Sequence, residues 1–264
     1  MHALLIVAAA IVAVAGAARS TWSPCGVSML ATVTPLAEHG RGHRYRSTAA
    51  WFIAGGTLGG ATLGLVMAAF ASGVRAASAS TVALAIVACA AAILAAASDT
   101  RLGGFRLPFH SRQVNERWLD QFRPWVYGAG FGWQIGAGLV TYIKTAALYL
   151  MIVLAALTAS PAVALAVGAL FGLTRGLAVL LGRGITSPTA LAAFHRRFTD
   201  AGPVVLAVVV ACELAVAVAF AAVVSLWIAL ALVLLGGAVA LGGRAHRRTQ
   251  EAAQTTPSRS CLLR

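Results

Sequence analysis

Six long apolar stretches, separated by shorter polar segments, dominate the chain. The apolar stretches cover residues 3–36, 48–72, 79–97, 125–157, 162–181 and 203–243. A membrane-spanning helix needs about 20 mostly apolar residues, because each residue adds about 1.5 Å to the helix axis. The pattern therefore predicts an all-α fold, a polytopic bundle of transmembrane helices.

The last apolar stretch sets the expected number of spans. Residues 203–243 contain a single charged side chain, Glu213, and one helix of that length would overshoot the bilayer. Two helices fit, with Ser225 as the best candidate for the join. This gives about seven spans, and six spans is the alternative if the stretch is one helix.

The first apolar stretch is interrupted by proline. Pro24 follows Ser23, and Pro35 follows Thr34 near the end of the stretch. Proline lacks a backbone N–H and breaks a helix, so Pro24 and Pro35 are predicted helix breaks. The opening residues resemble the apolar part of a signal peptide. No Lys or Arg precedes them, so we expect one long, broken helix that is retained.

The polar segments carry an excess of arginine. Three Arg lie in residues 38–46, five in 99–124 and three in 183–200, whereas the link after the second stretch has only Arg75. Basic loops favour the cytoplasmic side of a membrane. The pattern predicts a multi-pass cell-membrane protein with its N-terminus outside and its C-terminus in the cytoplasm. Residues 114–119 are predicted to form a short interfacial helix.

These boundaries predict four parts of the chain. The expected parts are a first three-helix repeat (1–98), a basic cytoplasmic loop (99–124), a second repeat with an extra C-terminal span (125–243) and a disordered basic tail (244–264).

Composition excludes a soluble domain. Of 264 residues, 60% are hydrophobic and 10% charged, and the mean hydropathy is +0.86. A soluble core of this length cannot hide so much apolar surface. The net charge of +13 would suggest nucleic acid in a soluble protein. Because the arginines lie in loops, we expect the lipid bilayer as partner and no nucleic acid.

Two rows of glycine occur at four-residue spacing in the second and fifth stretches. The rows are Gly56, Gly60, Gly64 and Gly168, Gly172, Gly176. This spacing puts the glycines on one helix face, where another backbone can approach closely. An odd number of spans separates the rows, so the two halves are expected to be inverted repeats. The alternative is that Ala/Gly-rich helices produce the spacing by chance.

The four cysteines show no metal-binding pattern. They are Cys25, Cys89, Cys212 and Cys261, without a C-x-x-C pair or a His/Cys cluster of zinc-ligand spacing, so no metal and no cofactor are predicted. Cys89 and Cys212 read as small buried hydrophobes. Cys25 directly follows Pro24, where a new helix can begin, and is the candidate reactive thiol.

The motif Ser23-Pro24-Cys25-Gly26, with the Phe52-x-x-Gly55-Gly56-x-x-Gly59-Gly60 pattern of the next span, resembles the transmembrane domain of the DsbD/CcdA thiol–disulfide electron carriers. The resemblance is clearest over residues 15–70 and weaker over 125–200. It implies two inverted three-helix repeats. It also implies transfer of reducing equivalents across the membrane, including to cytochrome c maturation, with a thioredoxin-like or cytochrome maturation protein as partner.

One departure from that family bears on function. The resemblance implies a second redox cysteine in the fourth span, near Gly132-Trp133-Gln134-Ile135-Gly136, and none is present there. Exchange with one thiol runs through a mixed disulfide. If the chain is a redox protein, Cys25 is thus its catalytic residue. A small-solute transporter and a non-catalytic membrane subunit that docks a redox partner are the alternatives.

Ionisable residues inside the predicted spans give a second candidate site. These residues are Arg19, Lys144, Arg175 and Glu213. Lys144 and Glu213 have opposite charge and are predicted to pair or to line a cavity with Gln134. The alternative is that Lys144 and Arg175 extend to the membrane interface.

Overall fold

The computed structural model describes residues 1–109, 121–139 and 143–234, and the regular structure within them is helical. The elements are α1 (His2–Ser20), α2 (Pro24–Thr32), α3 (Pro35–Gly40), α4 (Tyr45–Ala76), α5 (Thr81–Thr100), η1 (Leu102–Gly104), α7 (Pro124–Gly136), α8 (Ala147–Leu157), α9 (Pro161–Leu177), η2 (Ala178–Gly184) and α10 (Pro188–Val224). The predicted all-α bundle is confirmed.

Five helices of the described part are long and apolar enough to cross a membrane. They are α1, α4, α5, α9 continued by η2, and α10. The expected fourth span, residues 125–157, is not one helix but two shorter ones, α7 and α8. Gly138, at φ +67°, lies between them in a left-handed conformation that favours glycine.

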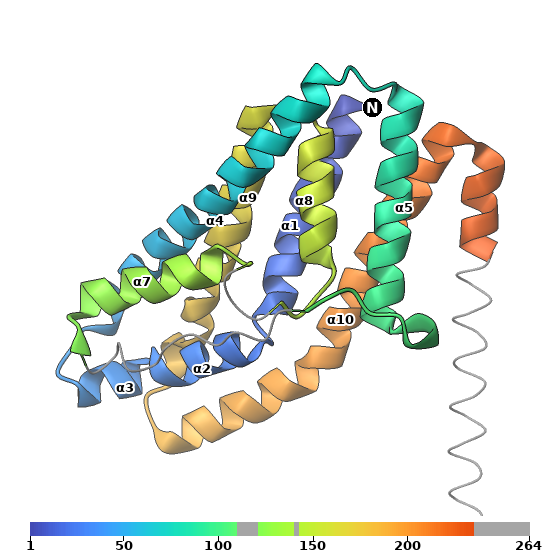
Figure 1. Cartoon of the computed structure of the whole chain (residues 1–264). Coiled ribbons are helices and arrows are strands. Elements are labelled where there is room, and N and C mark those ends of the chain that lie inside the picture. The colour runs from blue at the N-terminus through green and yellow to red at the C-terminus, as the bar shows by residue number, and fades with distance from the viewer. Residues whose placement is uncertain (110–120, 140–142, 235–264) are drawn as a thin grey trace, which may run out of the picture.

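The first apolar stretch is divided more strongly than expected. α1 ends at Ser20, and α2 and α3 then run along the lower edge of the bundle instead of continuing the axis of α1 (Figure 1). Pro24 and Pro35 are the first residues of α2 and α3, where a missing N–H leaves no helix bond unmade. We call residues 24–40 the strap.

The helix α10 begins earlier than the sequence suggested. Residues 183–200 were expected to form a loop, but α10 starts at Pro188 and takes up most of them. The Ser187 hydroxyl caps the helix by accepting a hydrogen bond of 3.2 Å from the Ala190 N–H. α10 ends before Ser225, which is extended at φ −163° and ψ 133°, and a further helical stretch follows over residues 226–234.

α4 lies between α7 and α9, with close backbone contact on both sides (Figure 1). A Cβ at Gly60 would overlap the backbone of Gly168 and Gly172, so the two predicted glycine rows face one another. A second row, not predicted, joins α4 to α7: a Cβ at Gly55 or Gly59 would overlap the backbone of α7. Helices with small residues at their contact can pack in this way.

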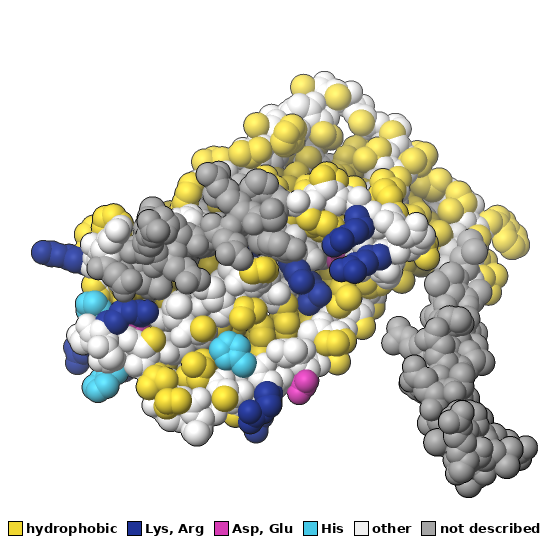
Figure 2. Space-filling model, turned by 60° about the horizontal axis from the view of Figure 1, so that its bottom comes forward, with side chains coloured by type: hydrophobic (Ala, Val, Ile, Leu, Met, Phe, Trp, Pro, Cys, Tyr) yellow, Lys and Arg dark blue, Asp and Glu magenta, His cyan; other side chains and the backbone are white. Residues whose placement is uncertain are grey.

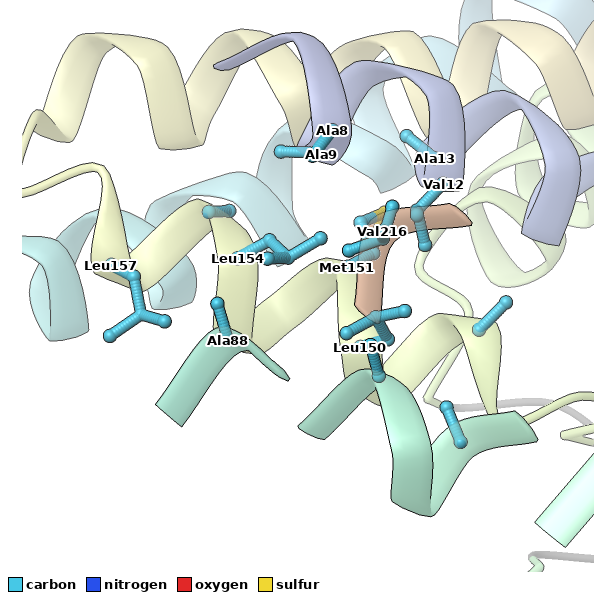
Figure 3. Packing of buried hydrophobic residues seen from close by; sticks show 14 of the residues in the cluster. Ala8, Ala9, Val12, Ala13, Ala88, Leu150, Met151, Leu154, Leu157 and Val216 are labelled. Carbon is cyan, nitrogen blue, oxygen red and sulfur yellow. The ribbon is translucent and has the colours of Figure 1, made fainter. Parts of the chain in front are cut away.

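Two groups of buried apolar side chains lie within the bundle. The larger joins α1, α4, α5, α8, α9 and α10, and Figure 3 shows Val12, Leu150, Met151 and Val216 meeting there. The smaller lies under the strap, where Leu30 and Val33 pack with Phe52 of α4 and Phe131 of α7. The strap is therefore part of the packed fold.

Three expectations lie outside the described residues. They are the interfacial helix over 114–119, the end of the last span up to residue 243, and the basic tail 244–264.

Candidate functional site

The Ser23-Pro24-Cys25-Gly26 motif forms the start of α2. Ser23 is the N-cap, and its hydroxyl accepts a hydrogen bond of 3.2 Å from the Gly26 N–H. Gly26 lies against the turn that ends α1, and a Cβ there would overlap the Thr21 carbonyl. Ser23, Pro24 and Gly26 thus each have a structural role at the start of α2, and they hold Cys25 at the second position of this helix.

Cys25 is buried, with 4% of its surface exposed, and it interacts electrostatically with Arg175 of α9. The N-terminal end of a helix carries partial positive charge. Two sources of positive potential, the α2 N-terminus and the Arg175 guanidinium, therefore act on one sulfur.

Arg175 connects the two broken spans. Its Nη1 donates a hydrogen bond of 2.7 Å to the Ile135 carbonyl near the end of α7, and its Nη2 donates one of 3.3 Å to the Ser20 carbonyl at the end of α1. The guanidinium carbon lies 5.9 Å from the centre of the Phe171 ring. Arg175 is 2% exposed, so it does not extend to an interface. The alternative that Arg175 reaches the membrane surface is wrong.

Carbonyls at a helix C-terminus lack partners within the helix and carry partial negative charge. A break inside a membrane leaves such groups without water. One guanidinium adds a second hydrogen bond to a carbonyl of each broken helix here, beside the backbone bonds from the Gly138 and Ser23 N–H groups. The sequence signal was Arg175 itself, an arginine one residue before the last glycine of the α9 row.

The break between α7 and α8 is capped by a carboxylate from α5. The Asp99 carboxylate, at the end of α5, accepts a hydrogen bond of 2.7 Å from the Ala146 N–H and another from the Thr145 hydroxyl, at the start of α8. A carboxylate at a helix N-terminus is stabilised by the unpaired N–H groups there. The residues 125–157 contain no cysteine, so nothing in this span corresponds to Cys25.

A buried carboxylate, Glu38, fastens the strap, and sequence reasoning missed it. Glu38 is 0% exposed. It accepts hydrogen bonds from the Thr48 hydroxyl at 2.6 Å and from the Tyr127 hydroxyl at 2.9 and 2.8 Å, and it forms an ion pair with Arg41 at 3.0 Å. Glu38 thereby ties α3 to α4 and α7.

The structure does not join Lys144 to Glu213. Lys144 is half-buried, and the charges that act on it are those of Arg19, Arg101 and Arg106. Both Glu213 carboxylate oxygens are without a hydrogen-bond partner among the described residues, and the charged group that acts on Glu213 is Asp99. Gln134 is half-buried on α7.

The remaining cysteines also stand apart from the break. Cys89 lies on α5 and Cys212 on α10, and no disulfide joins the described residues. Cys261 lies outside the described residues.

Comparison with known proteins gives one group of relatives. The chain is 33% identical over 184 residues to the methylamine utilization protein MauF of Paracoccus denitrificans, which covers 63% of the chain and 60% of that protein. It is 33% identical over 186 residues to MauF of Paracoccus versutus, with 67% and 65% covered, and 30% identical over 179 residues to MauF of Methylophilus methylotrophus, with 64% and 60% covered. The chain thus spans less than two thirds of the length of these relatives.

No family model matches the chain, and no solved structure matches it.

Proposed function

We propose that the chain is an integral membrane accessory protein of a methylamine utilization system and that it acts by thiol–disulfide exchange through Cys25. The MauF relatives support the first part, since they carry that name and match 63–67% of the chain. The observation that carries the second part is the position of Cys25, at the start of α2 and beside a buried arginine.

The proposed step uses one sulfur of this chain. The Cys25 thiolate attacks a disulfide of a partner protein, one partner sulfur forms the mixed disulfide with Cys25, and the other leaves as a thiolate. A third cysteine thiolate of the partner then attacks the partner sulfur of this mixed disulfide, forms a new disulfide within the partner and releases Cys25 as a thiolate. The exchange rearranges the partner's disulfide without net oxidation or reduction, so it needs one sulfur of this chain, which agrees with the absence of a cysteine from residues 125–157. A thioredoxin-like or cytochrome maturation protein has the required chemistry.

Access to Cys25 requires the strap to move, because the thiol is buried. The strap is held by the Glu38 hydrogen bonds to Thr48 and Tyr127 and by the bond from the Leu36 N–H to the Ile185 carbonyl at 3.1 Å. These contacts lie 13 and 11 residues along the chain from Cys25 (Glu38 and Leu36). We propose that docking of the partner loosens them and exposes the sulfur.

The proposed orientation places the strap at the cytoplasmic side. Figure 2 shows Lys, Arg and His side chains gathered on the lower face of the bundle, and an apolar surface above it. Arg41, Arg44 and Arg46 belong to the segment between the strap and the second turn of α4. Basic residues favour the cytoplasmic side.

The test is to trap the mixed disulfide. Membranes are quenched with acid and alkylated, and the chain is compared on gels with and without reductant. A variant with Cys89→Ser, Cys212→Ser and Cys261→Ser keeps Cys25 alone and should still form a reductant-sensitive adduct with another protein. The single Cys25→Ser variant should form none. An adduct that survives Cys25→Ser would overturn the proposed role of this thiol.

A docking subunit without thiol chemistry is the other outcome. If the chain only docks a partner, the organism that makes it should use methylamine equally well with the Cys25→Ser variant and with the wild type.

A further inference from the structure

Glu213 lies on the inner face of α10, not on the face that meets lipid. Val209, Val216, Ala217 and Phe220, which are three to seven residues away along the helix, are all buried. Residues three, four and seven apart lie on one helix face. Figure 3 shows Val216, one turn from Glu213, against Met151 of α8 and near Val12 of α1. The Glu213 side chain is thus directed among the apolar residues that join α1, α5, α8 and α10.

The Glu213 carboxyl group is completely buried and has no hydrogen-bond partner. Its exposed fraction is 0%, and neither oxygen accepts a hydrogen bond from any described residue. Glu38 is equally buried, but there Thr48, Tyr127 and Arg41 satisfy the carboxylate. An ionised carboxylate with no partner in an apolar region is far too costly to persist, whereas the protonated acid is tolerated. The burial and the missing partners therefore favour the protonated form of Glu213.

The neighbouring ionisable groups do not neutralise Glu213. α5 contributes Asp99, which is itself acidic, and Cys89, and Cys212 lies next to Glu213 on α10. The cation of α1, Arg19, interacts with Asp99 and donates a hydrogen bond of 3.5 Å to the Gly202 carbonyl. Asp99 is also satisfied by Thr145 and Ala146. When two carboxyl groups lie close enough to interact, the negative charge of one disfavours the ionisation of the other. Asp99 has the partners, so Glu213 keeps the proton.

We propose that Glu213 is a proton-binding site inside the membrane. The ligand is a proton and not a metal ion, because no group of three His, Cys, Asp or Glu side chains within the described residues could hold a metal. Release of the proton would place a second negative charge beside Asp99 in the contact between α5 and α10. Proton binding is thereby linked to the packing of these two helices. The site is separate from Cys25 and does not depend on its thiol chemistry.

The first test is infrared spectroscopy of the full chain in detergent or lipid. A protonated carboxylic acid has a C=O stretching band that an ionised carboxylate lacks. At neutral pH the wild type should show this band and lose it in alkaline buffer. Glu213→Gln, a neutral replacement of nearly the same shape, should abolish the band. Glu38→Gln is the matched control, and it should leave the band in place. Absence of the band from the wild type, or its persistence in Glu213→Gln, would overturn the proposal.

The second test uses dicyclohexylcarbodiimide, an apolar reagent that modifies protonated carboxyl groups in membranes. Mass spectrometry should find the label on Glu213 in the wild type, and it should be reduced in alkaline buffer. Sodium chloride should give no protection. Protection by sodium ions at constant pH would overturn the proposal, because a monovalent cation would then occupy the site. Absence of the label from Glu213 would also contradict it.

Discussion

Arg175 shows how one side chain stabilises two helix ends. Its two hydrogen bonds reach the Ile135 and Ser20 carbonyls, which are 40 and 155 residues away along the chain. Arginine suits this position because its planar guanidinium presents several donors in a fixed arrangement. Lysine has a single nitrogen and cannot reach both carbonyls with the same geometry.

Replacement of Arg175 should therefore lower stability in a graded way. Arg175→Met removes one charged donor from each of two buried carbonyls, which keep only their backbone bonds from the Gly138 and Ser23 N–H groups, at a cost of about 1.5–3 kcal/mol for each lost bond. Arg175→Lys should lie between this variant and the wild type. Thermal unfolding of the purified protein in detergent measures the order. Equal stability of Arg175→Met and the wild type would mean that the backbone bonds from the Ser23 and Gly138 N–H groups are sufficient at the two helix ends.

Glu38 explains why part of the site was not predicted. In the sequence it precedes His39 in a basic segment, and nothing distinguishes it from a solvated loop residue. Its burial depends on Tyr127, which is 89 residues away. Contacts of this range come from packing, whereas Cys25 was predicted because its signal, the adjacent Pro24, is local.

At the scale of the helices, α4 is unusual in meeting backbone on two faces. Gly56, Gly60 and Gly64 approach α9, and Gly55 and Gly59 approach α7. The four-residue spacing of the first row made it visible in the sequence, together with its counterpart in α9. The α7 partner row, Gly128, Gly132 and Gly136, has the same spacing but stands in a span that looked like one long helix.

Bulk in these rows should separate the helices. Gly60→Leu and Gly172→Leu each put a side chain where the facing backbone now lies, and overpacking of a tight contact costs about 1–3 kcal/mol or more. Both variants should show lower thermal stability and lower yield of folded protein in detergent.

Gly73→Leu is the matched control for this experiment. Gly73 lies on α4 as well, but a Cβ there meets nothing within 4 Å. Its stability should equal or slightly exceed that of the wild type, because leucine favours a helix more than glycine does. Wild-type stability in all three variants would show that the close approach of α4 and α9 contributes nothing.

The beginning of α10 marks a limit of hydropathy as a guide. Arg196, Arg197 and Asp200 make residues 183–200 polar, and this suggested a loop. The segment is helical because Ser187 caps it and because Trp22 fastens it to the end of α1: the indole N–H donates a hydrogen bond of 2.6 Å to the Phe198 carbonyl, and the Trp22 and Phe198 rings stack at 4.2 Å. Hydropathy reports the environment of a segment and not its conformation.

At the scale of the whole molecule, charge separates the two ends of the bundle. The strap and the segments that carry most of the described arginines lie at the lower end in Figure 1, and the link between α4 and α5 lies at the upper end. This arrangement leads to the expected topology, in which the lower end faces the cytoplasm.

Cysteine accessibility should reveal this topology. Ala77 and Arg44 are exposed and lie at opposite ends of α4, so Ala77→Cys and Arg44→Cys form a matched pair. A membrane-impermeant maleimide should label Ala77→Cys in intact cells and Arg44→Cys only after the membrane is permeabilised. The wild type, which carries only the native cysteines, measures the background labelling. The reverse pattern would require the whole bundle to be inverted.

The glycine rows of α4 also bear on how the chain is made. A ribosome completes α4 long before α7 and α9, so the nascent helix enters the membrane with two bare strips of backbone and no partner for either. These strips remain open to lipid until residues 124–177 have been inserted. A chain that stops before residue 124 would present them to any neighbouring helix with small residues at its surface. Such fragments are candidates for early removal by membrane proteases, and the tight middle of the bundle can form only after the second half of the chain has begun to enter the membrane.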